Sequence, residues 1–312
     1  MEQGSTIFVA GGSGVAGSAI VRELTRRGFN NLLVPSHKEL DLTDQQQVDH
    51  FFEVKQPEYV FFVAAKMGSI VYRNEHPADI LEQNLQMQLN VIRMAHRVHT
   101  KKLLFMSSDF IYPTTSSGVL CEDDFLTNAL GAKDLPYSLA KTVGVKLCDF
   151  YREQYGDAFF TVVPCAFFGE NSSFDLQRAS VVAALVKRFH EAKVNGDGEL
   201  ALWGSGKPVK EFLLSDDIAD ACIFLMERYE DGGIINVGSG DGGHTIMEIA
   251  QMICQATGFD GKIVCDLSKP DGIMRRVMDS SRLKKFGWTP RYPLEEAIGK
   301  FYSYFLMSKD LD

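Results

Sequence analysis

The chain has 312 residues, of which 45% are hydrophobic and 23% charged, a composition typical of globular proteins that excludes a disordered or fibrous chain. Its 32 lysines and arginines against 41 aspartates and glutamates give a formal net charge of −9. This balance argues against a general nucleic-acid-binding protein, because phosphate binding requires a basic surface.

The six cysteines are scattered, without Cys-x-x-Cys spacing and without histidine partners at metal-ligand spacing. We therefore expect neither a disulfide framework nor a metal site, and a reducing compartment suits the chain best. No signal-peptide pattern follows Met1, and no apolar run approaches the roughly 18 residues of a membrane-spanning helix. These observations predict a cytoplasmic protein with neither a nucleic acid nor a membrane as partner.

Short apolar segments alternate with longer amphipathic segments through the first half of the chain. The strands have few polar residues, as expected when helices cover both faces of a sheet, and the alternation predicts a parallel sheet. The predicted strands are 6–10, 31–35, 59–64, 102–107 and 159–164, and the predicted helices are 15–27, 44–55 with Thr43 as N-cap, 78–99 and 137–154.

The pattern becomes less regular after Pro164. Thr245 and Glu248 form a capping box that opens a helix ending near residue 257. The other predicted elements are a helix at 180–193, a glycine-rich segment at 195–206, strands at 212–214 and 234–237 flanking a helix at 217–228, a strand at 262–265 and a helix at 294–306.

A glycine-rich loop joins the first predicted strand to the first predicted helix. Gly11, Gly14 and Gly17 allow a tight turn, close approach of the backbone to a phosphate, and close contact between helix and sheet. The start of the helix adds free N–H groups and the positive end of the helix dipole, which favour a pyrophosphate. We interpret the loop as a dinucleotide-binding site; the alternative is a structural turn.

These patterns together predict a Rossmann-type, doubly wound parallel α/β sheet with a smaller mixed α/β C-terminal substrate lobe. Residues 1–165 plus about 211–240 form the predicted dinucleotide-binding domain, and about 166–210 plus 241–312 form the lobe. We expect the cofactor at the topological switch point of the sheet and the substrate between the lobes.

The residues after the second predicted strand bear on the choice of dinucleotide. A site for NAD usually places an acidic residue there to bind the ribose hydroxyls, but no carboxylate precedes Glu39. His37 and Lys38 are placed to meet a 2′-phosphate, which favours NADP. The alternative is that Lys38 is a solvated surface lysine.

Three residues form a candidate catalytic set. Tyr137 and Lys141 lie four residues apart on a predicted helix and therefore share one face. An ammonium beside a phenol favours the phenolate and is expected to lower the pKa of Tyr137. Ser108, just after the fourth strand, is placed to hydrogen-bond a carbonyl oxygen. The alternative for the Tyr–Lys pair is a chance surface pair.

Several motifs give the sequence a resemblance to the extended short-chain dehydrogenases/reductases, and more closely to the GDP-L-fucose synthases among them. The most specific are Trp203-Gly204-Ser205-Gly206 and Lys269-Pro270-Asp271-Gly272. The resemblance also rests on the segments 10–20, 64–70, 77–79, 102–105, 111–113, 136–141, 188–192, 211–213 and 235–238.

The resemblance implies that Ser108, Tyr137 and Lys141 are catalytic, that NADPH reduces a C4 ketone while Tyr137 protonates the oxygen, and that helices 78–99 and 137–154 form a homodimer through a four-helix bundle. The implied cofactor-binding residues are Gly11, Ser13, Gly14, Val15, Gly17, His37, Lys38, Asp41, Leu42, Ala64, Ala65, Lys66, Tyr137, Lys141 and Pro164.

A GDP-linked sugar is the implied substrate. Its implied contacts are Met67, Ser69, Ser108, Phe110, Ser180, Arg188, Trp203, Lys210, Asp271 and Arg275, with Arg276 as an alternative to Arg275. Lys210 stands where relatives usually have arginine, which keeps the charge but loses the bidentate fork. The alternatives are solvated surface charges for the cations and core packing for Trp203.

The pattern breaks at the two positions that serve epimerisation in the family. Relatives use a cysteine two residues after the catalytic serine and a histidine before the Arg-Phe-His-Glu-Ala motif, whereas this chain has Phe110 and Ser180. Neither side chain is a suitable proton acceptor near neutral pH. Cys165 and His190 are not expected to replace them.

The resulting hypothesis is an NADPH-dependent C4-ketoreductase acting on a GDP-4-keto-6-deoxy sugar, hexose or heptose, without 3,5-epimerase activity. One alternative is a bifunctional GDP-L-fucose synthase, which epimerises before reducing. The others are another nucleotide-sugar epimerase or dehydratase of the superfamily, and a non-catalytic dinucleotide-sensing protein.

Overall fold

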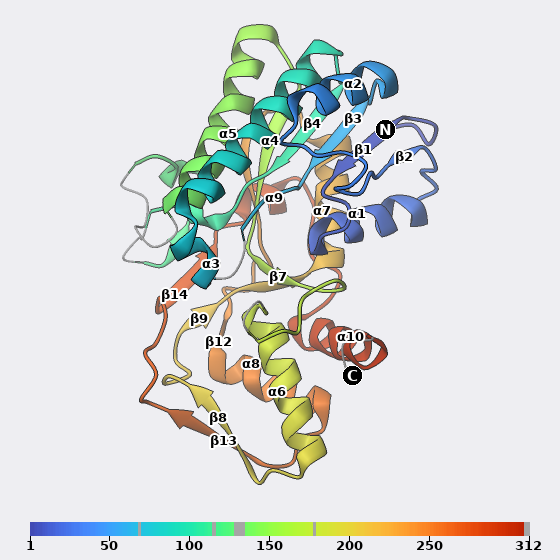
Figure 1. Ribbon diagram of the computed structural model, residues 1–312. Helices are drawn as coiled ribbons and strands as arrows, with labels where there is room; N and C mark the ends of the chain where they lie inside the picture. Colours follow the sequence, from blue (N-terminus) through green and yellow to red (C-terminus); the bar gives the residue numbers. More distant parts are fainter. Residues whose placement is uncertain (68–69, 114–116, 128–134, 177–178, 309–312) are drawn as a thin grey trace.

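A parallel sheet forms the larger part of the computed structural model, which describes residues 1–67, 70–113, 117–127, 135–176 and 179–308 (Figure 1). The sheet has six strands in the order β11-β6-β4-β3-β1-β2. In chain order they are β1 (Ile7–Ala10), β2 (Leu32–Leu33), β3 (Tyr59–Phe62), β4 (Lys102–Met106), β6 (Phe159–Pro164) and β11 (Gly233–Val237). Almost every residue of β1, β3, β4 and β6 is buried.

Helices cover both faces of this sheet. On one side α4 (Pro77–Arg97) packs against α5 (Leu135–Tyr155) and α2 (Gln45–Lys55). On the other side α1 (Val15–Arg26) packs against α7 (Ser215–Arg228), and Figure 1 shows the two groups separated by the strands. The prediction of a doubly wound parallel sheet is confirmed, and burial of both faces explains why its strands are almost purely apolar.

A second apolar core lies beyond the carboxyl ends of the main strands, in the lower half of Figure 1. Aromatic side chains dominate it, among them Phe168, Phe174, Phe189 and Phe301. Its framework consists of α6 (Val181–Asn195), α8 (Ile246–Thr257), α10 (Leu294–Met307) and the parallel strand pair β8 (Glu199–Trp203) and β13 (Lys262–Asp266).

Short strands join the two cores. The segment that begins at β14 (Arg275–Met278) leaves the smaller lobe and places Met278, Leu283 and Trp288 in the first core. The chain therefore crosses between the two cores more often than the predicted domain boundary at residue 241 implies. The joining strands are the pair β7 (Ala166–Phe168) and β10 (Phe212–Leu214), and a four-stranded sheet of β12 (His244–Thr245), β9 (Val209–Lys210), β14 (Arg275–Met278) and β5 (Val119–Leu120).

Local side-chain bonds decide two helix starts. The predicted capping box of Thr245 and Glu248 is present at the start of α8. The prediction of Thr43 as N-cap of α2 is wrong: Asp44 accepts hydrogen bonds from the N–H groups of Gln46 and Gln47 at 2.9 and 3.1 Å. The Thr43 hydroxyl is instead bonded to Asp41 at 2.7 Å. A carboxylate is the stronger acceptor for the exposed N–H groups of a helix start.

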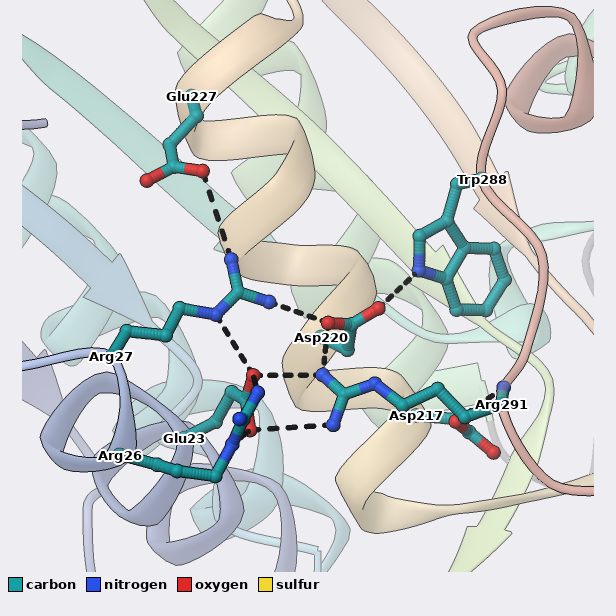
Figure 2. Close-up of polar contacts among 8 residues, drawn as sticks. All are labelled: Glu23, Arg26, Arg27, Asp217, Asp220, Glu227, Trp288 and Arg291. Atoms are coloured by element: carbon teal, nitrogen blue, oxygen red, sulfur yellow. Dashed lines mark hydrogen bonds and ion pairs between the residues drawn. The ribbon is translucent and has the colours of Figure 1, made fainter.

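A charged network ties α1 and α7 to the segment that precedes α10 (Figure 2). Arg291 and Arg27 both donate to Glu23, at 2.7 and 2.8 Å, and both also bind Asp220. Trp288 donates its indole N–H to the other oxygen of Asp220 at 2.8 Å. Carboxylates shared between two arginines in this way fix the position of the crossing segment against the larger domain.

Asp217 of α7, inside this network, gives a stability prediction. It is fully buried and accepts the backbone N–H of Arg291 at 2.9 Å, and burial raises its pKa from 3.8 to about 6. The protonated form is therefore favoured by folding, so this contribution to stability is lost as pH rises from about 4 to about 6.

We expect D217N to match the wild type at low pH and to have a higher Tm at neutral pH. Thermal unfolding across this range tests it, with D216N on the same helix as control; a difference in Tm that does not grow with pH would contradict it.

Candidate active site

Backbone contacts explain the glycines of the loop between β1 and α1. Gly11 has φ +94°, and a Cβ on Gly17 would lie 2.1 Å from the Gly11 carbonyl oxygen, so neither position accepts a side chain. Gly14 is the N-cap of α1. Among the described residues no side chain caps α1, and its first turn carries no acidic side chain. The Gly14 N–H closes the turn on the Gly11 carbonyl at 3.1 Å, and the N–H groups of Ser13 and Val15 at the start of α1 suit a pyrophosphate.

The carboxylates that follow β2 are engaged locally. Glu39 accepts the N–H and hydroxyl of Ser36 at 2.7 and 2.8 Å. Asp41 likewise accepts the N–H and hydroxyl of Thr43. His37 and Lys38 are exposed, and Leu42 is buried. His37 Nδ1 lies 4.0 Å from Asp41 Oδ1, and His37 and Lys38 together suit the additional phosphate of NADP.

The segment after β3 is fixed by a residue that sequence reasoning missed. Asn84 of α4 is buried, accepts the Lys66 N–H at 3.0 Å and donates to the Lys66 carbonyl at 2.7 Å. This pair of bonds holds the predicted cofactor segment, Ala64 to Met67, at the end of its strand. Of the other predicted residues in this region, Pro164 is buried at the end of β6, and Ser69 lies outside the described residues.

The structure brings the candidate catalytic residues together at the carboxyl ends of β4 and β6. Tyr137 and Lys141 lie one turn apart on α5 and are both buried, with the Lys141 Nζ atom 5.8 Å from the Tyr137 ring centroid. Lys141 Nζ donates to the carbonyl of Met106 at 2.7 Å. Ser108 follows β4 and hydrogen-bonds Tyr137. The chance-surface-pair alternative is therefore wrong.

Burial determines the protonation of this set. It raises the pKa of Tyr137, and Asp109 raises it further, whereas Arg73 and Ser108 act in the opposite direction. Burial also lowers the pKa of Lys141 to about 7. The expectation that Lys141 lowers the pKa of Tyr137 is thus not met, because a desolvated ammonium is only partly charged near neutral pH. Tyr137 is consequently a protonated group, ready to act as an acid.

Phe110 contacts Tyr137, the candidate catalytic tyrosine, directly. Its ring is nearly perpendicular to that of Tyr137, at 84°, with centroids 6.2 Å apart. The Arg276 guanidinium lies 5.6 Å from the Phe110 centroid and is ion-paired with Asp109. Arg275, the neighbour of Arg276 on β14, instead donates to the Gly242 carbonyl. Of the two arginines left open by the sequence, Arg276 is the one beside the catalytic set.

The residues at and around the epimerisation positions are used otherwise. Ser180 is the N-cap of α6, where its hydroxyl accepts the Ala183 N–H at 3.4 Å. Cys165 is buried, and burial raises the pKa of its thiol well above the ordinary range. His190 lies in the second core with its Nδ1 atom 3.0 Å from the Tyr302 hydroxyl. These three side chains are thus engaged in other contacts or buried as a neutral thiol, and Phe110 carries no proton acceptor.

A second group of predicted residues lies at the far end of the smaller lobe. Trp203 is 65% exposed, which rules out core packing as its role. The Arg188 guanidinium and the Lys269 ammonium lie 5.6 and 5.7 Å from its ring centroid. An exposed indole flanked by cations is suited to stack a planar base whose attached phosphates are anionic. Lys269 was not singled out from the sequence, although it belongs to the quoted Lys-Pro-Asp-Gly motif.

The two motif segments of the lobe hold one another. Asp271 accepts the N–H and the hydroxyl of Ser205 at 2.8 and 2.7 Å, and a Cβ on Gly204, whose φ is +81°, would lie 2.4 Å from Asp271. Asp271, predicted as a substrate contact, therefore has its carboxylate engaged in shaping the loop after Trp203. Lys210 is half-buried on β9, and burial and Arg276 lower its pKa while Asp109 raises it.

Within the described residues no group of three or more His, Cys, Asp or Glu side chains is arranged to hold a metal ion. The six cysteines are all free thiols. None of the helices in the described part of the chain has the length and apolar character needed to cross a membrane.

Comparisons with known proteins agree with this geometry. GDP-L-fucose synthase 1 of Arabidopsis thaliana is 44% identical over 305 residues, covering 98% of this chain and 94% of that protein. A GDP-6-OMe-4-keto-L-xylo-heptose reductase of Campylobacter jejuni is 32% identical, with a TM-score of 0.89 over 98% of this chain and 99% of that one. The C. jejuni GDP-mannoheptose C4 reductase, solved with NADP bound, is 33% identical, with a TM-score of 0.88 and the same coverage.

The family model for the NAD dependent epimerase/dehydratase family matches residues 7–238, most of the larger domain and part of the smaller lobe. The resemblance to the GDP-L-fucose synthases within the extended short-chain dehydrogenases/reductases is confirmed. The chain belongs to the NAD dependent epimerase/dehydratase family, and the relatives it is similar to are GDP-sugar synthases and reductases.

Proposed function

We propose that this protein is an NADPH-dependent C4-ketoreductase of a GDP-4-keto-6-deoxy sugar, hexose or heptose, and that it does not epimerise C3 or C5. The observation that carries the proposal is the combination of an assembled Ser108–Tyr137–Lys141 set with a phenyl ring against Tyr137 where relatives have a thiol. Two heptose reductases among the similar structures and a fucose synthase among the relatives support a GDP-sugar as substrate.

The chemistry follows from the protonation states of the set. When bound, NADPH would supply the hydride that C4 of the ketone receives. Ser108 donates a hydrogen bond to the carbonyl oxygen and so stabilises the negative charge that develops there. Tyr137, kept protonated by burial, then transfers its proton to that oxygen, which gives the alcohol. Lys141, one helical turn away, becomes charged as anionic groups bind nearby, and thereby stabilises the tyrosinate that remains.

Electrostatics and stacking suit the remainder of the substrate. Trp203 with Arg188 and Lys269 offers a stacking surface for guanine, and half-buried Lys210 gains charge stabilisation from a diphosphate. The NADP site would lie in residues 1–165 plus about 211–240 and the GDP-sugar site in the smaller lobe. The protein as a whole has a net charge of −9. We therefore infer that these cations attract the anionic substrate locally and that the overall field of the protein does not steer it.

Deuterium exchange tests the missing epimerase activity. Epimerisation must remove the protons at C3 and C5, which are adjacent to the ketone, and return them from solvent. The test incubates GDP-4-keto-6-deoxymannose with the protein in heavy water without NADPH. We expect deuterium uptake at C3 and C5 to be no faster than in the absence of enzyme, because neither Phe110 nor Ser180 accepts a proton. Mass spectrometry of the recovered sugar measures the uptake, and a relative with the cysteine and histidine is the positive control.

The alternatives give different results in the same experiment. Enzyme-dependent deuterium uptake at either carbon, followed by GDP-L-fucose formation on addition of NADPH, would identify a bifunctional synthase and overturn the proposal. A protein purified with tightly held NAD and no net NADPH consumption would indicate another epimerase or dehydratase. Failure to oxidise NADPH with any GDP-4-keto sugar, hexose or heptose, would leave the dinucleotide-sensing alternative.

We also propose a homodimer through α4 and α5. Exposed apolar side chains lie along these two helices, namely Leu89, Leu139, Val143 and Phe150. A second copy would bury them in a four-helix bundle, which is the arrangement expected for amphipathic helices that pack against each other in antiparallel or parallel pairs.

A further inference from the structure

Asp109, between the catalytic serine and Phe110 in the sequence, is bound on both sides. Its Oδ1 atom accepts the Ser108 hydroxyl at 3.2 Å, and its Oδ2 atom accepts Arg276 Nε at 2.5 Å. The backbone carbonyl of Asp109 accepts Arg276 Nη2, also at 2.5 Å. Arg276 thus donates to a side-chain oxygen and to the main-chain oxygen of the same residue. A planar guanidinium can make two such bonds from different nitrogens, whereas an ammonium cannot.

The pair is largely removed from solvent. The Arg276 and Asp109 side chains are 13% and 22% exposed, and Asp109 belongs to a single 3-10 turn, Asp109–Ile111, that Ser108 caps. In a desolvated setting each charge requires the other, and loss of one partner leaves the second uncompensated. The turn that follows the catalytic serine is therefore held from β14, an element more than 160 residues away along the chain.

Arg276 also determines where Phe110 lies. Its guanidinium is 5.6 Å from the Phe110 ring centroid, on a ring that meets Tyr137 at 84°. Cation–π contact and the fork on Asp109 together fix the plane of the guanidinium, and the guanidinium in turn restricts the phenyl ring. A continuous set of contacts thus runs from Asp109 through Arg276 and Phe110 to the catalytic tyrosine.

The charges around the pair separate its role from that of Lys210. Arg276 and Lys210 are register partners on β14 and β9; Asp109 is ion-paired with Arg276 and also raises the pKa of Lys210. Two of the donor nitrogens of Arg276 are already bonded within the protein. Lys210 is therefore available to bind a diphosphate in this part of the site, whereas Arg276 is engaged in contacts with Asp109 and Phe110 beside Tyr137.

We propose that Asp109 and Arg276 are positioning residues that hold Phe110 against Tyr137 and thereby set the orientation in which a GDP-linked keto sugar meets Ser108 and Tyr137. The inference rests on the proposed function and adds to it the side chains that set the orientation of the ketone in the site. A sugar carrying an apolar C–H face would pack on the Phe110 ring, while its carbonyl oxygen points to the serine and tyrosine hydroxyls.

The first test compares R276Q, R276K and D109N with R282Q, which removes another arginine that is ion-paired with an aspartate, the exposed pair Arg282–Asp123. We expect R276Q and D109N to lower kcat/KM for the keto sugar roughly 100-fold, mostly through kcat, because misplacement of a reacting group by about 1 Å costs this much. R276K should recover only part of the loss, since an ammonium cannot span both oxygens, and R282Q should retain wild-type activity. Loss of the Asp109–Arg276 pair should lower the Tm, so a cooperative unfolding transition and unchanged NADPH affinity show that the variants are folded.

A double-mutant cycle with F110L separates positioning from direct substrate contact. If Arg276 acts through the phenyl ring, the cost of R276Q should shrink from roughly 100-fold to about 3-fold in the F110L background, and GDP alone should bind R276Q as tightly as it binds the wild type. An undiminished cost in F110L, together with weaker GDP binding measured by calorimetry, would overturn the proposal and make Arg276 a diphosphate ligand.

The outcomes also separate this inference from the function on which it rests. A wild-type enzyme that reduces GDP-4-keto sugars, combined with an R276Q variant of full activity, overturns the positioning role alone. A wild-type protein that reduces none of these sugars overturns the proposed function, and the positioning role with it.

Discussion

Replacing Tyr137 with phenylalanine is expected to lower kcat for ketone reduction by roughly 10³-fold, the usual contribution of a well-placed general acid. The substitution removes only the hydroxyl, and the phenyl ring retains its packing against Phe110. Tyr137 is buried, is hydrogen-bonded to Ser108 and has its pKa raised by burial and by Asp109, so it is held as a proton donor at neutral pH.

The assay follows NADPH consumption with a saturating GDP-4-keto sugar, alongside NADPH binding and thermal unfolding. NADPH affinity should change little, because Tyr137 is expected to contribute mainly to the chemical step. Y229F is the matched control: the Tyr229 hydroxyl donates to the Gly232 carbonyl away from the site, so its loss should cost about 1 kcal/mol of stability and no activity. A Y137F enzyme with a kcat within tenfold of the wild type would require a different proton donor.

Replacing Lys141 with methionine is expected to lower activity by roughly 10²-fold or more while making the unliganded protein more stable at neutral pH. Lys141 is 1% exposed, and its ammonium donates to the Met106 carbonyl at 2.7 Å. Burial lowers its pKa from 10.5 to about 7, so folding favours the neutral amine. The stability that this group contributes is present above its ordinary pKa and is lost as pH falls toward 7.

The gain in Tm for K141M should therefore be largest near and below pH 7 and should fade toward pH 10. Thermal unfolding at several pH values without cofactor measures it, and the same preparation is assayed for NADPH-dependent reduction. K146M is the control on the same helix, because Lys146 is partly exposed and bonded to Asp149. A K141M protein that is less stable than the wild type at every pH would show that the lysine stabilises the fold rather than the reaction.

The parts of the molecule that the sequence predicted well are those decided by neighbours along the chain. The glycines between β1 and α1, the four-residue spacing of Tyr137 and Lys141, and the capping box at Thr245 all depend on local geometry. The same is true of the long apolar strands of the main sheet, because burial of both faces leaves a continuous hydrophobic run. Even among local features, Thr43 and Asp44 compete for one helix start, and only their contacts distinguish them.

Short strands escaped prediction because their pairing is with distant segments. β5, β9, β12 and β14 have between two and four residues each, too few to show a period, yet they form one sheet across the two cores. β8 was predicted as a glycine-rich segment, although its alternating buried and exposed residues were a usable signal. Alternation also implies that Arg275 and Arg276 face opposite ways, but the register that sends Arg276 toward Phe110 comes from the pairing with β9 and β5.

The sequence by itself determined the glycine-rich loop, the candidate Ser–Tyr–Lys set and the absence of cysteine and histidine from the epimerisation positions, since each is a matter of residue type at a local spacing. Only the tertiary structure decided the protonation of Tyr137 and Lys141 and the partner of Asp109. The physical reason is that burial and ion pairing depend on segments brought together by folding: the pKa of a side chain reflects how much water has been removed around it, and Arg276 reaches Asp109 only because β14 returns to the larger domain.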